Sequence, residues 1–414
     1  MKTLMFVSLM VFAFVLIPVS AVMAVDCVGC HQKETPGIVG DWKLSKHSAN
    51  DVDCSTCHGD GHKSKDDVAN VELPTPDVCA TCHDTQVTQF SAGKHAVAWA
   101  AMNAMPTTHG LPEALSDGMK GCGGCHKIGL KSEEDMKKLK AEGAGFGVAS
   151  CDACHTRHTF SVKEAKQPEA CQTCHMGFDH PQWEMYSSSK HGVRYGLVRD
   201  GILPEGAAAP TCQTCHMQEG NHEVRTAWGF LAVRLPLPED PQWAADQATI
   251  LQALGVLDPE GNPTGRLDVV KAADVARLDK ASFDIEREKM LNTCGQCHSS
   301  NFAEAEMAKG DDMIREIDHL LAQGIRIIAD LYKDGVLEKP ESYAYPFPDL
   351  LTFHDAPTTI EQTLFEMHLK HRMRAFQGVF HANPDYALWY GWSEMIRDLT
   401  EIKEKAAELR AEHK

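Results

Sequence analysis

Eight copies of the pattern Cys-x-x-Cys-His run along this chain and use all 16 of its cysteines. This pattern is the attachment signature of c-type haem, in which the cysteines form thioethers and the histidine binds the iron. A lone Cys-x-x-Cys is more typical of a redox dithiol or half a zinc site, but eight copies with a fixed histidine favour covalent haem. A disulfide framework is the weaker alternative, because the two cysteines of each motif are too close in sequence to join distant segments.

The motifs therefore predict eight covalently bound haem c groups. The attaching residues are Cys27, Cys30, Cys54, Cys57, Cys79, Cys82, Cys122, Cys125, Cys151, Cys154, Cys171, Cys174, Cys212, Cys215, Cys294 and Cys297. The proximal iron ligands are His31, His58, His83, His126, His155, His175, His216 and His298.

The first residues predict export from the cytoplasm. Lys2 precedes an apolar run over residues 4–19, and small residues follow at Ala21 and Ala24. This arrangement is typical of a signal peptide over residues 1–24, with an uncleaved anchor as the alternative, although the run is short for a membrane span. Because haem c is attached outside the cytoplasm, both features indicate a periplasmic or otherwise extracytoplasmic protein that is soluble once the signal peptide is removed.

The charge of the chain bears on its partners. A net charge of −18 disfavours nucleic-acid binding. An acidic surface would attract a basic redox partner, and we expect a small cytochrome or a quinol-linked membrane protein in that role. Simple solubility is an equally good explanation of the same charge.

The spacing of the motifs predicts the fold class. Seven motifs fall between Cys27 and His216, which leaves too little chain between them for an ordinary apolar core. We expect a mainly α fold with a haem-packed head and little sheet, followed by a long-helix C-terminal bundle. The expected divisions are a seven-haem domain at 25–230, a connecting segment with the eighth motif at 231–300, and a helical region at 301–414.

Apolar periodicity predicts the helices of the second half. The expected helices cover residues 268–291, 304–332 and 358–380, and a last one runs from about residue 387 to the charged end. Thr358 or Thr359 is the expected cap of the third helix, and Asn383-Pro384-Asp385 ends it.

The remaining histidines are candidates for the second axial position on each iron. Of 22 histidines, eight are proximal, so 14 remain. A lone histidine is more often a surface residue than a ligand. In this chain His47, His95 and His191 each follow a lysine, with an aromatic residue a few positions earlier. His62, His158 and His180 closely follow a motif, and His109 lies in the loop before the fourth motif. The candidates are His47, His62, His95, His109, His158, His180 and His191. Among the histidines of the tail, His381 is the best candidate.

Several segments resemble the octahaem hydroxylamine oxidoreductase family. The motif order also matches, with seven motifs, a gap, an eighth motif and then helices. The segments that carry the resemblance are residues 151–161, 168–182, 189–192, 212–217, 221–222 and 380–391.

The resemblance implies roles for particular residues. Seven haems would be held by two histidines each, and the fourth, on Cys122, Cys125 and His126, would be catalytic. An acid–histidine pair of the family falls at Asn221 and His222, where asparagine replaces the acid. Hydroxylamine-oxidising members are trimers in which a tyrosine of a neighbouring subunit is bonded to the catalytic haem, and Tyr386 and Tyr390 are the candidates here.

These features predict an oxidoreductase that acts on small nitrogen compounds such as hydroxylamine or nitrite, in either direction, and forms a homotrimer. The alternative is a non-catalytic electron-transfer cytochrome with two histidines on every haem. An octahaem reductase of sulfur oxyanions is a third possibility. A nitrite reductase of another type is disfavoured, because those enzymes commonly carry lysine in one motif and this chain has none.

Overall fold

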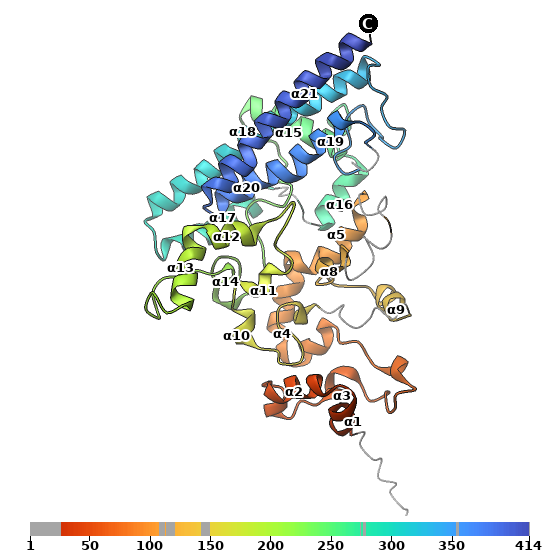
Figure 1. The fold of residues 1–414 in the computed structure, drawn as a ribbon, viewed down its shortest axis with the longest axis vertical. Coiled ribbons are helices and arrows are strands. Elements are labelled where there is room, and N and C mark those ends of the chain that lie inside the picture. The colour runs from red at the N-terminus through yellow and green to blue at the C-terminus, as the bar shows by residue number, and fades with distance from the viewer. Residues whose placement is uncertain are drawn as a thin grey trace, which may run out of the picture.

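The molecule is elongated and built almost entirely of helices (Figure 1). The computed structural model describes residues 26–106, 112, 121–141, 150–273, 275, 279–352 and 356–413. Within these ranges no residue lies in a β-strand, and an isolated bridge pairs Leu257 with Pro263. The prediction of a mainly α fold with long C-terminal helices is confirmed. The predicted signal peptide over residues 1–24 lies outside the described residues.

The first part of the chain forms short helices joined by loops. They are α1 (Cys27–Glu34), α2 (Pro36–Leu44), η1 (Ser48–Asn50), α3 (Cys54–His58), η2 (Val68–Asn70), α4 (Pro76–Ala92), η3 (Lys94–Val97), α5 (Ala98–Ala104), α8 (Gly123–His126), α9 (Glu133–Ala141), η4 (Cys151–Ala153), α10 (Val162–Ala165), α11 (Glu169–Gln172), α12 (Gln182–Ser188), α13 (Lys190–Arg199), α14 (Cys212–His216) and η5 (Gln218–Gly220).

The second part forms longer helices. They are α15 (Pro241–Ala253), α16 (Gly265–Ala273), α17 (Lys280–Gly295), α18 (Ser300–Lys333), α19 (Thr359–Glu366), η7 (Met367–Arg372), α20 (Met373–Phe380), η8 (Asp385–Trp392) and α21 (Ser393–Glu412).

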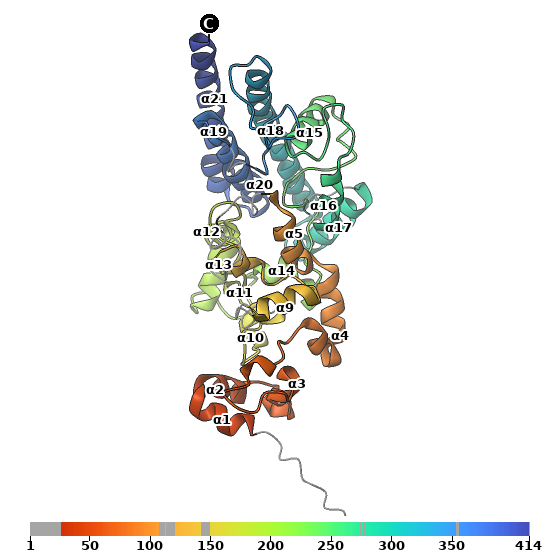
Figure 2. The same ribbon diagram turned by 90° about the vertical axis from the view of Figure 1, so that its right-hand side faces the viewer.

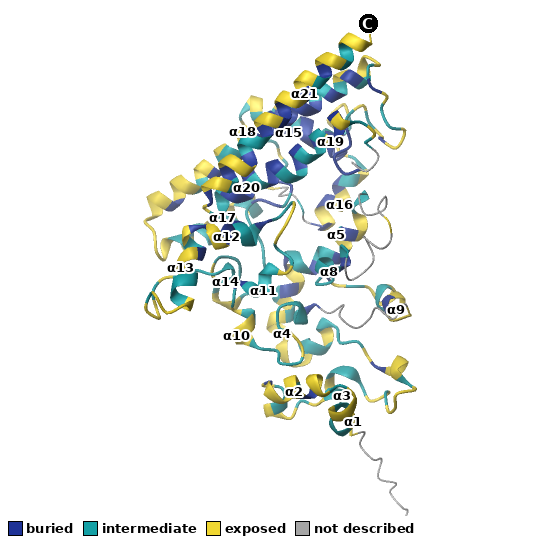
Figure 3. Ribbon diagram, in the orientation of Figure 1, coloured by how far each residue is buried: buried dark blue, intermediate teal, exposed yellow. Residues whose placement is uncertain are grey.

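The apolar core lies in the C-terminal bundle. The long helix α18 buries Ile314, Ile317, Leu321, Ile325 and Ile328, which recur at helical spacing on one face. This face packs against α15, α20 and α21. Figure 3 shows buried residues gathered in this bundle, whereas the lower half of the molecule is mostly half-buried or exposed.

The head, which is the described part of residues 25–230, has no comparable apolar core. Its small apolar cluster consists of Trp99, Met102 and Leu139, with Cys122 packed against it. Figure 2 shows the short helices α1 to α3 at one end of the molecule and the bundle at the other. Short helices around the motifs agree with the expectation that cofactors, rather than side chains, fill the head.

Two of the expected helices differ in detail. The helix expected over residues 268–291 is divided into α16 and α17, because Asp279 caps a new helix by accepting a hydrogen bond from the Ser282 amide at 2.6 Å. The helix expected over 358–380 does begin with a capping box of Thr358 and Glu361, but its middle turn, η7, is a π-helix. No helix in the described ranges is long and apolar enough to span a bilayer.

Candidate haem sites

Several motifs close a single turn of backbone. In the fourth motif the His126 amide donates to the Cys122 carbonyl at 3.0 Å, and the fifth, sixth and eighth motifs have the same bond. One such turn brings the first cysteine, the second cysteine three residues on and the histidine four residues on to the same face. This is the arrangement that two thioethers and one axial ligand to the same haem require.

Caps fix where three of these turns begin. The carboxylates of Asp26 and Asp53 accept hydrogen bonds from the amides of Gly29 and Thr56, so a helical turn starts at the first cysteine in each case. Thr211 does the same for the seventh motif. None of the 16 cysteines, all within the described residues, forms a disulfide.

Seven of the eight proximal histidines have a second histidine ring at 6.1 to 6.3 Å between ring centres. A metal–imidazole bond is about 2 Å long, so two imidazoles on opposite sides of one metal have centres roughly 6 Å apart. The residues present therefore fit a haem iron between each pair. The pairs, proximal residue first, are His31–His62, His58–His158, His83–His47, His155–His222, His175–His95, His216–His381 and His298–His191.

These pairs include five of the predicted distal candidates, His47, His62, His95, His158 and His191. A sixth candidate, His180, is a second neighbour of His175 at 6.2 Å. The Nδ1 of His180 is bonded to Asp179, and its ring also bonds the Cys174 backbone. Because these two bonds already hold the His180 ring to protein groups, His95 fits the axial position opposite His175 better. The seventh candidate, His109, lies outside the described residues.

His126 of the fourth motif differs from the other seven. Its Nδ1 donates to the Ala98 carbonyl at 3.0 Å, which leaves Nε2 for a metal. No second histidine ring packs against it in the parts of the chain that the structure describes. The fourth motif is therefore the one whose distal side has no histidine from these residues.

Burial keeps several of these imidazoles neutral, as metal ligation requires. It lowers the pKa of His175 to about 3, with further contributions from His95 and His180. It lowers the pKa of His216 to about 4, helped by His381 and His95. Burial also lowers the pKa of His381, whose Nδ1 donates to the Gln377 carbonyl at 2.8 Å.

Cysteines of different motifs contact each other along the length of the molecule. Cys79 lies within electrostatic range of Cys151, and Cys171 lies within electrostatic range of Cys212. Electrostatic contacts join the first motif to the second, the second to the third, the fifth to the sixth, and the seventh to the eighth. The motifs thus form the sequence 1–2–3–5–6–7–8, which runs from α1 towards α17 (Figures 1 and 2).

The fourth motif branches from this sequence at the sixth. Cys125 lies within electrostatic range of Cys174, and its Sγ lies 3.9 Å from the Thr173 carbonyl oxygen. The fourth motif is therefore the side branch of an otherwise linear array.

The predicted pair of Asn221 and His222 does not lie at the fourth motif. The His222 ring stacks on His155 of the fifth motif at 6.3 Å, and the Asn221 side chain accepts a hydrogen bond from the Glu223 amide at 2.8 Å. The pair that does lie near the fourth motif is Asp179–His180, because His180 bonds Cys174, which touches Cys125.

Asp179 controls the charge of His180. Burial alone would lower the His180 pKa, but the hydrogen bond and negative charge of Asp179, with smaller contributions from the Cys174 backbone and Glu184, outweigh it and leave the pKa raised above its ordinary value of 6.5. An imidazole with a carboxylate partner can hold and transfer a proton near neutral pH.

The two candidate tyrosines lie on η8. The rings of Tyr386 and Tyr390 are 5.1 Å apart, and burial together with Glu184 raises the pKa of Tyr386. Tyr390 is 52% exposed and its neighbour Trp389 is 62% exposed. The tyrosines therefore combine contact with α12 on one side and solvent access on the other.

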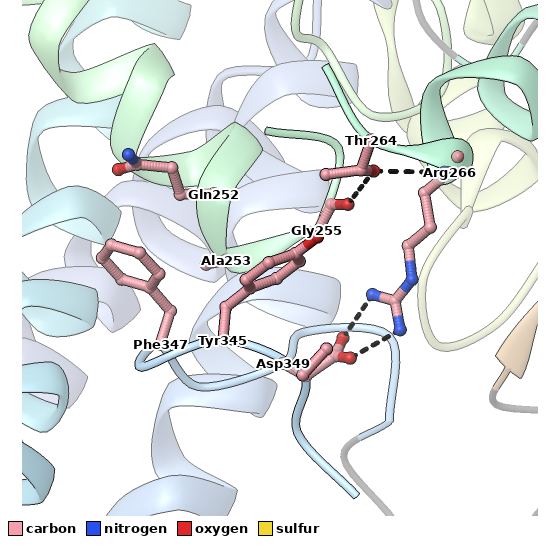
Figure 4. A pocket seen from close by; sticks show the side chains of 10 residues that line it. Gln252, Ala253, Gly255, Thr264, Arg266, Tyr345, Phe347 and Asp349 are labelled. Carbon is pink, nitrogen blue, oxygen red and sulfur yellow. Dashed lines mark hydrogen bonds and ion pairs between the residues drawn. The ribbon is translucent and has the colours of Figure 1, made fainter. Parts of the chain in front are cut away.

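Two cavities lie outside the histidine pairs. One, of about 700 Å³, is lined by residues in and around the seventh motif and on α17, including Thr211, Thr214 and Lys289. The other, of about 170 Å³, lies in the bundle beside the Arg266–Asp349 ion pair (Figure 4). No cysteine or histidine lines this second cavity, so it is separate from the haem sites.

Comparison with known proteins identifies the class. The family model described as "Seven times multi-haem cytochrome CxxCH" matches residues 50–234 and 268–342, and the model "Cytochrome c554 and c-prime" matches residues 18–59. The chain therefore belongs to the multihaem CxxCH cytochromes, whose defining motif is the attachment signature of covalently bound haem c.

One named protein is similar to this chain over most of the length of the chain. A Kuenenia stuttgartiensis protein named "Probable nitrite reductase-hydroxylamine oxidoreductase fusion protein" is 27% identical over 93% of this chain. The chain spans about half of that relative, 51% of its length. The predicted resemblance to the hydroxylamine oxidoreductase family is confirmed.

Two solved structures share the fold. A chain of a Kuenenia stuttgartiensis "reducing HAO-like protein complex" matches with a TM-score of 0.63 and 25% identity, over 93% of this chain and 85% of that one. A "Hypothetical multiheme protein" matches with a TM-score of 0.67 and 22% identity, over 94% and 95% of the two chains.

Proposed function

We propose that this chain is an extracytoplasmic octahaem cytochrome c that carries out multi-electron redox chemistry on small nitrogen compounds, such as hydroxylamine or nitrite, at the fourth motif. The observation that carries the proposal is the asymmetry among the proximal histidines: seven have an imidazole partner at ligation distance, and His126 has none among the described residues. A haem with two histidine ligands carries electrons, whereas one with an open side can also bind a substrate.

The haem of the fourth motif supplies the redox chemistry when it is bound, and the protein supplies orientation and protons. His126 is held by its bond to the Ala98 carbonyl, which fixes the tautomer and the plane of the ring. His180 is the acid–base residue, with Asp179 orienting its ring. This assignment replaces Asn221 and His222, since His222 is the natural partner of His155.

The branch at the sixth motif supports the same proposal. A reaction that transfers several electrons needs carriers close to the site, so that partly converted intermediates are not released. Cys125 lies against Cys174, which places the fourth motif one step from an array of seven others.

Assays with the purified holoprotein test this function. We expect hydroxylamine oxidation with an artificial electron acceptor, or nitrite or hydroxylamine reduction with a reduced dye. If neither activity appears in a preparation that carries its full complement of haem, the chain is an electron-transfer cytochrome. That second candidate requires a distal histidine on the fourth haem, a role for which the sequence predicts His109, a residue outside the described part of the chain.

Direction is tested separately. Peptide mass spectrometry of the holoprotein would reveal a haem peptide joined to Tyr386 or Tyr390. The exposed side chains of Trp389 and Tyr390 support a contact between subunits, as the trimer of the oxidative relatives requires. A cross-linked peptide supports oxidation, and its absence together with reductive turnover supports the reductive direction.

A further inference from the structure

We propose that Gln377 is the positioning residue through which the C-terminal bundle sets the geometry of the haem site on His175 and of the Asp179–His180 pair. Its role at Asp179–His180 rests on the function proposed above, whereas its role at His175 does not. Gln377 lies in the middle of α20 and is only 5% exposed. Figures 1 and 2 show α12, which begins at Gln182, next to α20.

A chain of side-chain hydrogen bonds joins the bundle to His175. The Nε2 of Gln377 lies 3.2 Å from the Asp179 carbonyl oxygen, and its Oε1 lies 2.9 Å from the Nε2 of Gln182. The Oε1 of Gln182 in turn lies 3.3 Å from the Nδ1 of His175. Gln377 therefore reaches a proximal ligand and the backbone of the acid–histidine pair with one amide group.

These bonds form a relay from His175 through Gln182 and Gln377 to the Asp179 carbonyl. Iron ligation by His175 fixes the donor and the acceptor of each bond in it. A histidine that binds iron through Nε2 carries its proton on Nδ1, so His175 must donate and the Gln182 oxygen must accept. The Gln182 amide nitrogen then faces Gln377, whose oxygen accepts. The remaining Gln377 nitrogen can only donate, and the Asp179 carbonyl is the acceptor it meets. Each group has one consistent role, so the relay has a single arrangement.

Neighbouring contacts with the bundle hold the segment around Asp179 and Gln182 in place. The Nδ2 of Asn383 donates to the Met185 carbonyl at 2.9 Å and to the Ser188 hydroxyl at 2.8 Å, which pins α12 beside the end of α20. On the other side, the Lys370 ammonium lies 5.9 Å from the ring centre of Phe178. The segment that contains Asp179 and Gln182 is thus held at both ends by the bundle, with Gln377 between.

The backbone of Gln377 serves a different haem site. Its carbonyl accepts the Nδ1 proton of His381, the partner of His216. Because this bond uses the main chain, replacing the Gln377 side chain leaves it in place. The His216–His381 site is therefore an internal reference for any variant at this position, since damage to α20 as a whole would alter it too.

The test uses Gln377→Met and Gln182→Met, which remove the relay while keeping similar side-chain volumes. Individual low-spin haems are followed by EPR during a redox titration, with the His216 species identified by its response to His381→Met. A ligand imidazole that loses its hydrogen-bond acceptor donates less electron density, so we expect the reduction potential of the His175 haem to rise in Gln182→Met, which removes that acceptor. A smaller rise is expected in Gln377→Met, where Gln182 keeps its oxygen but loses the side chain that orients it. The His216 species should keep its wild-type potential and EPR signal.

Turnover separates the two arms of the relay, which are the bond from Gln377 to the Asp179 carbonyl and the bonds from Gln377 through Gln182 to His175. Gln182→Met keeps the Gln377–Asp179 bond, whereas Gln377→Met removes it, so turnover should fall further in Gln377→Met, by roughly 10- to 100-fold. If Gln377→Met does not fold, Gln182→Met alone decides the His175 arm. Unchanged potentials in Gln182→Met, or equal shifts at His175 and His216, would overturn the proposal. The potentials are measured without substrate, so they stand even if the chain proves inactive towards nitrogen compounds.

Discussion

At the scale of single residues, the role of each histidine depends on which groups its two ring nitrogens bond. Nδ1 donates to a carbonyl or carboxylate in His58, His126 and His381, which leaves Nε2 free for a metal. His180 differs, because Asp179 raises its pKa and both of its bonds are to protein groups. A residue of this kind suits proton transfer better than ligation.

Replacing either member of that pair should slow turnover without loss of haem. We expect His180→Gln to lower turnover by about 10²- to 10⁴-fold, the usual contribution of an acid–base residue. The matched control is His319→Gln, since His319 also bonds a carboxylate, Asp246, at 2.9 Å, but lies in the bundle. Steady-state assays at equal haem content provide the comparison, and equal losses in the two variants would count against the assignment.

The Asp179–His180 pair also predicts a pH dependence. Asp179 raises the His180 pKa, whereas burial lowers it, so Asp179→Asn should leave burial as the dominant influence. The His180 limb of the kcat/KM profile should therefore move to lower pH. A limb that stays in place would show that another group is responsible for it.

The same scale shows what sequence could and could not predict. The motifs identify every proximal histidine, because the chemistry requires adjacent residues. Distal partners are found only by folding: His58 meets His158 and His216 meets His381 across long stretches of chain. His222 was assigned to catalysis by resemblance, and its place beside His155 has no local signature. The sequence offers His180 as a candidate distal ligand, but it does not show that His180 lies near the fourth motif.

At the scale of elements, the positions of helices decide which histidines meet. Helix α13 carries His191 in its first turn, and this residue faces His298 of the eighth motif. The helix packs closely on α12 at Gly192, where an added Cβ would lie 2.0 Å from the Tyr186 carbonyl oxygen. Gly196, one turn further along, has nothing within 4 Å of the same position.

This pair of glycines gives a matched test of the packing. Gly192→Ala should force α13 away from α12, lower stability by about 1 to 3 kcal/mol and disturb the His191–His298 site. Gly196→Ala should leave the spectrum unchanged and stabilise the helix slightly. Thermal unfolding and the low-spin EPR signals of both variants check this, and indistinguishable behaviour would mean that the close contact is not important.

At the scale of the whole molecule, the two halves are held together by different means. The main apolar cluster begins at Trp228 and includes residues of α15, α18, α19, α20 and α21. The described part of the head has little apolar core, so its order should depend on the bound haems. The periodic stripe of α18 predicted the bundle, whereas no periodicity could predict the arrangement of a head whose core is made of cofactors.

A chain without haem should therefore fold in part. In limited proteolysis of protein produced without haem attachment, we expect cleavage throughout residues 26–227 and protection of residues 228–413. The holoprotein should resist cleavage in both parts under the same conditions. A haem-free head as resistant as that of the holoprotein would show that side-chain packing, rather than haem, orders it.

The number of open haems distinguishes a redox enzyme from an electron-transfer cytochrome. Quantitative EPR and magnetic circular dichroism of the holoprotein should give seven low-spin haems with two histidine ligands and one high-spin haem per chain. Cyanide or hydroxylamine should convert the high-spin signal alone, and His126→Met should alter it while leaving the other seven. Eight low-spin haems that do not respond to either ligand would contradict the account and indicate an electron-transfer protein.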